Sequence, residues 1–427
     1  MTLRTSTRAA IAAAAALVLA PALLTATAAH ADPTGVADDY VLSAGALFTT
    51  PAGHGVLAND VGVVLNTLID VSAAPAHGVL TMNLDGTFSY LPVAGYVGVD
   101  TFSYCLKLVV GPCLTPAVSV HLTINATIER IGGADRYAVS AGVAHEFATE
   151  GGTVYVASGE VFPDALSASA AAGAQGAPVL LVAHDTIPAL VGAELSRLQP
   201  QRIVLVGGLN TVSAAVETAL GAYSSDVVRL TGADRFAVSA AVSLDAFGAN
   251  RPIAYIASGG VFPDALSGSA AAGRLGGPVL LVSHDTVSAE VKTELTRLHP
   301  AKIVVLGGTN TVADGVLTTL AGFTPGTVTR VGGADRYAVS AAIAAGFPES
   351  DTHTLYVASG EVFPDALSGS AAAIKNGAPV LLVTRDSVPA DVAAQLTRLH
   401  PLHIVVLGGP NTVSPANYTA IGGYLGH

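Results

Sequence analysis

Cysteine is almost absent from this chain of 427 residues, in which Cys105 and Cys113 are the only two. Neither recurs in the repeated part of the sequence described below, so the sequence supports no redox or metal-binding role for a thiol. Two interpretations remain: a disulfide bond across a hairpin of an exported protein, or a pair of free thiols. We expect the disulfide bond.

Basic residues are also scarce, with 19 lysines and arginines against 31 aspartates and glutamates and a net charge of −12. A nucleic-acid-binding protein needs cations to neutralise phosphates, so we expect no nucleic acid as a partner. The acidity is typical of a soluble protein. Local clusters of arginine can still bind an anion on such a surface.

Long apolar runs are missing after the N-terminus, so no later segment is expected to span a membrane. Residues 1–31 are predicted to be a cleaved signal peptide: Arg4 and Arg8 form a positive region, an apolar stretch follows, and Ala29-His30-Ala31 is a small-x-small cleavage site. A membrane anchor is the competing interpretation, but Pro21 breaks a stretch that is already short. Cleavage leaves a secreted chain with a net charge of −14.

The motifs of common catalytic and nucleotide-binding sites are absent as well. The sequence has no G-x-S-x-G, no H-E-x-x-H and no G-x-x-x-x-G-K-[ST] phosphate-binding loop. His184-Asp185 and His284-Asp285 resemble a base with an orienting acid, but the third equivalent pair is Arg385-Asp386, which cannot act as a base. We therefore expect neither catalytic residues nor a cofactor or metal site.

What the sequence does contain is one segment in three near-copies. The run Gly133–Ser140 returns at Gly232–Ser239 and again at Gly333–Ser340, and later motifs repeat in the same order and spacing. We assign the repeats to residues 127–225, 226–325 and 326–427. Three equal sites favour multivalent binding over catalysis, because an enzyme normally needs one asymmetric site.

Within each repeat, short runs of Val, Ile and Leu alternate with helical segments. In the first repeat the expected strands are 128–131, 154–157, 178–182 and 203–206, and the expected helices are 135–147, 163–174, 188–198 and 213–220. Such alternation is typical of a parallel sheet covered by helices on both faces. The predicted fold class is α/β, with three tandem doubly wound modules.

Residues 32–126 differ, because apolar and polar residues alternate between turn signals and predict an all-β sandwich. The pattern Asp38-Asp39-Tyr40, Val56-Leu57-Ala58-Asn59-Asp60 and Asp100-Thr101-Phe102-Ser103-Tyr104 resembles the bacterial immunoglobulin-like and cadherin-like domains of surface proteins. Asp38, Asp39, Asp60 and Asp100 are either calcium ligands or the aspartates that turns and strand ends favour. A protein partner of this domain cannot be named from the sequence.

Each repeat offers one candidate binding site, formed by an arginine at the first helix and the turn before the second helix. Ligands of open α/β sheets bind beyond the carboxyl ends of the strands, and guanidinium groups and helix N-termini bind anions. The candidate residues are Arg136, Ser158 and Asp164; Arg235, Ser258 and Asp264; and Arg336, Ser359 and Asp365. The competing interpretation is structural: Pro-Asp starts the helix, and the recurring Asp-Arg pairs hold neighbouring repeats together.

The repeated motifs R-[ILV]-x-G-A-D-R-[YF]-A-V-S-A, A-S-G-x-V-F-P-D-A-L-S and P-V-L-L-V resemble the type 2 cell-wall-binding repeats of Gram-positive bacteria. The resemblance implies three modules around a pseudo-threefold axis and noncovalent attachment to an anionic wall polymer. It therefore implies a surface protein that displays its β domain as a spacer or adhesin. The alternatives are a wall hydrolase of the N-acetylmuramoyl-L-alanine amidase type, for which His54, His77 and His121 are the available histidines, and a self-assembling surface-layer protein.

Overall fold

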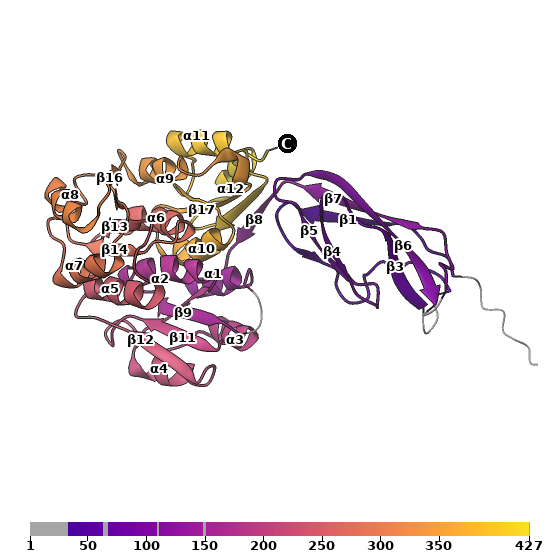
Figure 1. Cartoon of the computed structure of the whole chain (residues 1–427), viewed down its shortest axis with the longest axis horizontal. Coiled ribbons are helices and arrows are strands. Elements are labelled where there is room, and N and C mark those ends of the chain that lie inside the picture. Colours follow the sequence, from indigo (N-terminus) through magenta and orange to yellow (C-terminus); the bar gives the residue numbers. More distant parts are fainter. Residues whose placement is uncertain (1–32, 63–66, 109–110, 148–150, 427) are drawn as a thin grey trace, which may run out of the picture.

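A computed structural model describes residues 33–62, 67–108, 111–147 and 151–426. The chain has two parts, a β-sandwich and a larger α/β body, which lie end to end (Figure 1). The predicted signal peptide lies outside the described residues. Among the helices of the described part, none is long and apolar enough to cross a membrane.

The N-terminal part is the expected sandwich. One sheet has the order β1 (Asp38–Ser43), β7 (Val118–Asn125), β6 (Gly98–Leu108), β3 (Thr67–Ala73), and the other has the order β2 (Phe48–Thr49), β5 (Phe88–Pro92), β4 (Gly78–Met82). Phe88, Tyr90, Phe102 and Tyr104 are buried between the sheets, which explains the alternating pattern of the strands that carry them.

The expected disulfide bond between Cys105 and Cys113 is present, with 5.7 Å between the two Cα atoms. Cys105 lies on β6, and Cys113 forms an antiparallel bridge with Lys107 of the same strand. The bond therefore joins two segments that pair through an antiparallel bridge, as the hairpin interpretation predicted.

The α/β body contains three sets of equivalent elements. The first repeat consists of β8 (Thr127–Ile131), α1 (Arg136–Ala144), β9 (Thr153–Ser158), α2 (Pro163–Ala174), β10 (Val179–Val182), α3 (Ala189–Leu198), β11 (Arg202–Val206) and α4 (Ala214–Leu220). The second consists of β12 (Asp226–Leu230), α5 (Arg235–Ala246), β13 (Ala254–Ser258), α6 (Pro263–Arg274), β14 (Val279–Val282), α7 (Ala289–Leu298), β15 (Ile303–Leu306), α8 (Asp314–Leu320) and η1 (Ala321–Phe323). The third consists of β16 (Val328–Val331), α9 (Arg336–Ala344), η2 (Glu349–Asp351), β17 (Thr354–Ser359), α10 (Pro364–Lys375), β18 (Val380–Val383), α11 (Ala390–Leu399), β19 (His403–Leu407) and α12 (Pro415–Gly422).

Local signals fix several of these boundaries. The side chain of Asp135 accepts hydrogen bonds from the backbone N–H groups of Tyr137 and Ala138 and so caps α1. The helix ends at Ala144 rather than at the expected Phe147. Pro163 occupies the first turn of α2, where its missing N–H group costs nothing.

The three parallel-sheet modules of the predicted fold class are present, and each sheet also takes one strand from a neighbouring repeat. The sheet of the first repeat has the order β10-β9-β11-β12, so its last strand belongs to the second repeat. Likewise β16 completes the sheet of the second repeat, and β8 of the first repeat completes the sheet of the third. Every pairing in these sheets is parallel, and the exchange of strands closes the three modules into a ring.

The helices α2, α6 and α10 pack against one another at the centre of this ring. A buried serine on each helix donates a hydrogen bond to a carbonyl of the next: Ser169 to Leu367, Ser269 to Leu166 and Ser370 to Leu266, over 2.7, 3.1 and 3.0 Å. These three equivalent bonds define the pseudo-threefold axis that the resemblance implied.

The sandwich joins the ring through the single residue Ala126, between β7 and β8. Leu402, in the loop before β19, is only 8% exposed and packs with the core of the sandwich. Its carbonyl accepts a hydrogen bond from the N–H group of Thr127 over 2.8 Å. The two parts therefore share apolar contacts as well as the chain itself.

Candidate functional site

The candidate site begins at the turns that follow the central strands β9, β13 and β17. The hydroxyl oxygens of Ser158, Ser258 and Ser359 each accept a hydrogen bond over 3.1 Å from the N–H group two residues later. The serines thus shape these turns, as side-chain hydroxyl groups commonly do. All three serines are buried, and their oxygen atoms are engaged in hydrogen bonds within the turns.

The aspartates after the turns, Asp164, Asp264 and Asp365, are only 6–7% exposed. Burial raises the pKa of each carboxyl group, against the opposing effect of a nearby arginine. Each lies beside a glycine with positive φ that follows the last strand of its repeat. At Gly307 (φ +91°), a Cβ atom would stand 2.3 Å from Oδ2 of Asp264, so the close approach requires glycine.

Each arginine of the candidate set reaches the turn of its own repeat. Arg136, Arg235 and Arg336 donate to the carbonyl oxygens of Gly159, Gly259 and Gly360. The expected grouping of each arginine with the serine-containing turn of the same repeat is therefore present.

The expected grouping of arginine and aspartate is different. In each case the arginine whose charge lowers the pKa of the aspartate belongs to another repeat. Arg235 acts on Asp164, Arg336 on Asp264 and Arg136 on Asp365. An arginine therefore lies near the aspartate of the preceding repeat, not near its own. The reason is the packing of α5 on α2, of α9 on α6 and of α1 on α10, which brings neighbouring repeats together at these residues.

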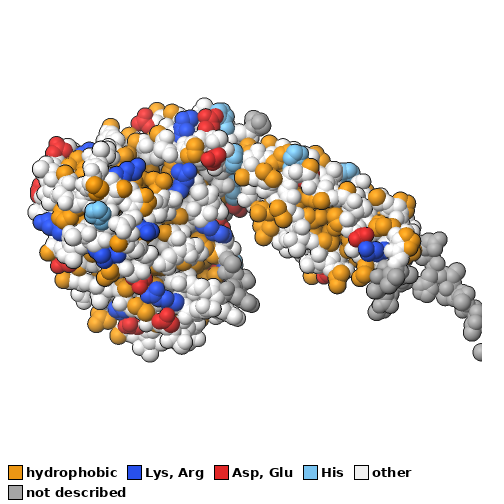
Figure 2. All heavy atoms as spheres, viewed as in Figure 1, with side chains coloured by type: hydrophobic (Ala, Val, Ile, Leu, Met, Phe, Trp, Pro, Cys, Tyr) orange, Lys and Arg blue, Asp and Glu red, His pale blue; other side chains and the backbone are white. Residues whose placement is uncertain are grey.

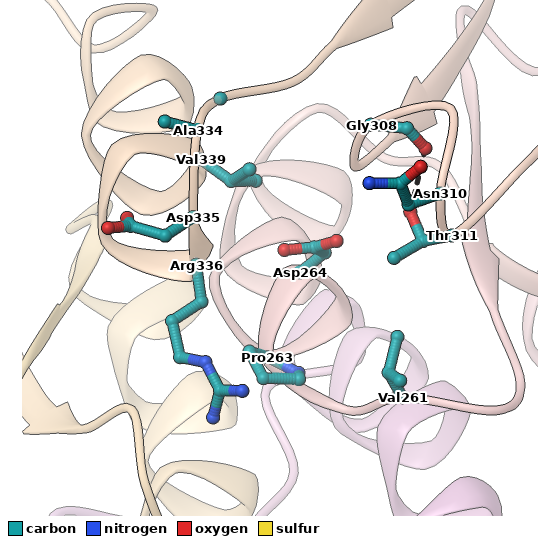
Figure 3. A pocket seen from close by; sticks show the side chains of 11 residues that line it. Val261, Pro263, Asp264, Gly308, Asn310, Thr311, Ala334, Asp335, Arg336 and Val339 are labelled. Carbon is teal, nitrogen blue, oxygen red and sulfur yellow. Dashed lines mark hydrogen bonds between the residues drawn. The ribbon is translucent and has the colours of Figure 1, made fainter.

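Pockets lie at two of these junctions. One of about 180 Å³ is lined by Asp264 and the Asn310–Thr311 turn from the second repeat and by Arg336 from the third. Figure 3 shows the Asp264 carboxylate facing that turn, with Arg336 at the edge beside Pro263 and Asp335 pointing away. The equivalent pocket between the third and first repeats measures about 190 Å³ and is lined by Asp365, Asn411 and Arg136.

A further hollow of about 280 Å³ lies on the second repeat and is lined by Arg235, Ser258, His284 and Asn310. Because Asn310 also lines the pocket around Arg336, the two hollows adjoin. The two adjoining hollows thus offer one arginine from the second repeat and one from the third, together with amide and hydroxyl groups. These groups suit a ligand that carries both anionic and hydroxyl groups.

Sequence reasoning missed an aromatic cluster beside these pockets. Phe162, Phe262 and Phe363 meet across the axis, with ring centroids 5.7–5.8 Å apart. The guanidinium of Arg136 lies 5.6 Å from the centroid of Phe363, and that of Arg336 lies 5.7 Å from Phe262. The recurrence of phenylalanine in the Val-Phe-Pro-Asp motif was the available signal.

The second arginine series is structural. Arg130, Arg229 and Arg330, on the exchanged strands, donate to the carbonyl oxygens of Gly408, Gly207 and Gly307 over 2.8–2.9 Å. Each bond crosses from one repeat to the preceding one around the ring. These bonds join neighbouring repeats through backbone carbonyl oxygens, whereas the structural interpretation named Asp-Arg pairs.

The histidine–aspartate pairs span turns. In His284, one ring nitrogen lies 2.7 Å from a carboxylate oxygen of Asp285 and the other 3.1 Å from the carbonyl oxygen of Thr309. His184 makes the equivalent contacts with Asp185 and Leu209, over 2.9 and 3.2 Å. Both nitrogens of each ring are thus engaged within the protein.

In the sandwich, two of the four aspartates considered as calcium ligands are held by hydrogen bonds within the protein. Asp100 accepts hydrogen bonds from three backbone N–H groups and a tyrosine hydroxyl, and Asp60 from one of each kind. Within the described residues, the one group of three potential metal ligands is Asp70 with Cys105 and Cys113, whose sulfur atoms form the disulfide bond.

The fold and the site define a closed, three-repeat α/β protein that carries an immunoglobulin-like domain. All three repeats match the family model described as cell wall binding domain 2, over residues 130–217, 229–317 and 330–418. The chain therefore belongs to this family, and its repeats are cell wall binding repeats. Residues 30–107 match the model of a bacterial Ig domain.

Two curated proteins of Bacillus subtilis (strain 168) are similar to the chain. N-acetylmuramoyl-L-alanine amidase LytC is 24% identical over 288 residues, and the amidase enhancer is 28% identical over 265 residues. These matches cover 67% and 62% of the chain, but only 56% and 36% of the two relatives.

Two solved structures share the fold. Cwp6 from Clostridium difficile has a TM-score of 0.68 and 18% identity, over 93% of this chain and 68% of Cwp6. Cwp8 from the same organism has a TM-score of 0.63 and 19% identity, over 84% of this chain and 63% of Cwp8.

Proposed function

We propose that the protein is exported and held noncovalently on the bacterial cell wall by its three repeats, which bind an anionic wall polymer at the inter-repeat pockets. The sandwich is then displayed as a spacer or adhesive domain. The observation that carries this proposal is the recurrence of one pocket type, in which an arginine of one repeat faces the Asn-Thr turn of its neighbour.

The distribution of charge supports the ring as the binding part. Figure 2 shows basic side chains over the ring, whereas the same face of the sandwich carries few charged groups. Because the protein is acidic overall, attraction to a polyanion has to be local.

Each pocket also contains a buried aspartate, which repels an anionic group but accepts hydrogen bonds from hydroxyl groups. A polymer that presents both sugar hydroxyls and anionic groups satisfies the aspartate and the arginine together. Several weak sites on one polymer multiply through effective concentration.

A pull-down of the protein with purified walls, before and after chemical removal of the anionic secondary polymer, tests this function. We expect binding to intact walls and little binding to stripped walls. Equal binding to both would refute the polymer as ligand while leaving wall binding itself in place.

The amidase alternative gains no support from the histidines of the sandwich. His77 stacks on Tyr96 with 4.0 Å between ring centroids, and His121 pairs with Asp39 over 3.2 Å. Together with His54, they form no metal-ligand group among the described residues. Zymography on wall substrate tests this alternative, for which a lytic band abolished by replacing one of these histidines would be decisive.

A further inference from the structure

The three contacts between repeats differ at the edge of the ring where the strands begin. The position eleven residues after the capping aspartate of the first helix holds Glu146, Asp245 and Gly346 in the three repeats. Two repeats thus extend a carboxylate toward their neighbour, and the third has no side chain there.

At the contact between the third and first repeats, Glu146 is the central acceptor. Its Oε2 accepts hydrogen bonds from the hydroxyl of Tyr356 over 2.6 Å and from the amide of Asn376 over 2.9 Å. His403 lies 2.9 Å from a second carboxylate, that of Glu129. Polar groups of the third repeat are therefore matched by two acids of the first.

At the contact between the first and second repeats, Arg202 donates to Asp245 over 2.6 Å. Arg202 occupies the position of His403, and Asp245 that of Glu146. An acid–base pair again joins the two repeats.

At the contact between the second and third repeats, both acids are missing. Gly346 replaces Glu146, and Thr329 replaces Glu129. The cations nevertheless remain on the other side, as Lys302 and Arg274. Among the described residues, neither cation has a carboxylate within ion-pair distance.

A pocket of about 250 Å³ occupies the place of the missing carboxylate, and Tyr255, Arg274, Lys302 and Gly346 all line it. Tyr255 is the counterpart of Tyr356, whose hydroxyl donates to Glu146 in the equivalent contact. The guanidinium of Arg274 lies 4.7 Å from the ring centroid of Phe347, which fixes it at the pocket while its N–H groups remain available. Val304 and Val331 contribute apolar wall.

We infer that this pocket binds a small anionic group, a phosphate or a carboxylate, which takes the place of the acid that the other two contacts supply from within the chain. Tyr255, Arg274 and Lys302 are its binding residues. Among the described residues of the ring, this combination of two cations without a facing carboxylate belongs to the contact between the second and third repeats, and the site lies apart from the pockets of the proposed function, on which it does not depend.

Burial raises the pKa of the Tyr255 hydroxyl, against the opposing effect of Arg274, so the hydroxyl stays protonated and can donate at neutral pH. One hydroxyl and two cations then surround an anion that has no competing acid in the pocket. This absence of competition distinguishes the site from the pockets around Asp264 and Asp365.

The test compares melting temperatures in sodium phosphate, sodium acetate and sodium chloride at matched ionic strength and pH, for the whole chain. We expect phosphate, acetate or both to raise the melting temperature of the wild type above its value in chloride by about 2 °C. A rise in melting temperature in phosphate alone would indicate a phosphate-bearing ligand, and a rise in acetate alone would indicate a carboxylate. A rise in both salts would indicate a site that binds either anion. No rise in either salt would overturn the inference.

Gly346→Glu is the critical variant because it restores the carboxylate of the other contacts. Gly346 does not have a positive φ, and an added Cβ atom would stand 3.3 Å from the carbonyl oxygen of Ile343, so a side chain requires only a small adjustment. We expect this variant to melt above the wild type in chloride and to lose the anion-specific rise. A general stabilising effect of phosphate on protein surfaces would persist in the variant, so an undiminished rise would refute the site.

The double variant Arg274→Gln, Lys302→Gln should lose the anion-specific rise as well. Lys292→Gln is the matched control, because Lys292 is an exposed lysine of α7 outside the pocket. The Lys292→Gln variant should keep the full anion-specific rise in melting temperature. If the double variant does not fold, the comparison of Gly346→Glu with the wild type still decides the question.

Discussion

Arg130 donates a hydrogen bond over 2.8 Å to the carbonyl oxygen of Gly408, a residue 278 positions further along the chain. The bond accompanies the parallel pairing of β8 with β19. It is therefore a direct link between the start of the first repeat and the end of the third. The ring is complete only when both ends of the α/β body are in place.

Replacing Arg130 with methionine retains the apolar stem of the side chain and removes this bond. We expect the free energy of unfolding of the ring to fall by about 1.5–3 kcal/mol, the usual contribution of a hydrogen bond to a charged group. Urea denaturation followed by circular dichroism measures the change. Arg229→Met should cost at least as much, because Arg229 bonds to Val212 and Glu217 as well. An unchanged midpoint for Arg130→Met would contradict the structural role.

The first arginine series is predicted to bind the polymer. A single replacement, such as Arg336→Gln, removes a contact worth about 1.5–3 kcal/mol and should weaken wall binding modestly, because the equivalent arginines of the other two repeats remain. The triple replacement of Arg136, Arg235 and Arg336 should nearly abolish binding in the pull-down.

The matched control is the triple replacement of Arg130, Arg229 and Arg330 by glutamine, which removes the same charge away from the pockets. It should lower stability while its folded fraction still binds walls. If the variant of Arg136, Arg235 and Arg336 also melts early but binds walls at full strength when folded, those arginines are structural.

The stability of the sandwich should depend on pH through Asp38. Burial, followed by the charge of Asp60, raises the pKa of Asp38 from 3.8 to about 7. The folded state therefore holds a proton that the unfolded state has lost between about pH 4 and pH 7. The free energy of unfolding should fall as the pH rises through that window, and the stabilising effect of the proton is present in full only below it.

Asp38→Asn should remove this part of the pH dependence, because asparagine does not titrate. Asp39 is the exposed neighbour of Asp38. The variant Asp39→Asn loses the same charge and should keep the pH dependence. Melting curves of the sandwich from pH 4 to pH 8 give the comparison. Parallel profiles for the wild type and Asp38→Asn would show that another group is responsible.

The disulfide bond should stabilise the sandwich and leave the ring unaffected. Closing a loop between cysteines eight positions apart is worth about 2–3 kcal/mol in the chain-entropy model. The double variant Cys105→Ala, Cys113→Ala should lower the unfolding midpoint of the sandwich accordingly, without changing that of the ring. A loss confined to the ring would contradict the assignment.

The space between the central helices α2, α6 and α10 should accommodate only one large side chain at this level. Ile374 of α10 fills it, and a Cβ atom placed at Gly173 or Gly273 would stand 2.4 Å from its Cδ1 atom. Gly173→Ala should therefore cost about 1–3 kcal/mol through overpacking. Adding Ile374→Ala should recover part of that loss, and a double-mutant cycle measures the coupling. Additive effects would show that the two residues do not compete for space.

Much of the fold could be predicted because the signals are local. The helix 163–174 was expected from Pro163 and the alanine-rich run after it, and α2 has those bounds. The cap at Asp135 and the buried run of Val179–Val182 are likewise visible within a few residues of sequence.

The sequence could not predict which arginine lies near which aspartate. Because the repeats are nearly identical, three equivalent aspartates are possible partners for every arginine. The choice of Asp264 by Arg336 follows from strand exchange and from the packing of α9 on α6, which involve residues far apart in the chain. The same holds for Phe162 and its two counterparts, which meet only in the closed ring.

The short connection at Ala126 has a mechanical consequence. A pulling force on the sandwich enters the ring at β8, the strand whose pairing with β19 closes it, and at Leu402, which is seated in the sandwich core. Because only Ala126 separates β7 from β8, this linker transmits the force with little extension. The load thus falls on a hydrogen-bonded sheet and an apolar contact side by side, so detachment of the sandwich requires both to yield.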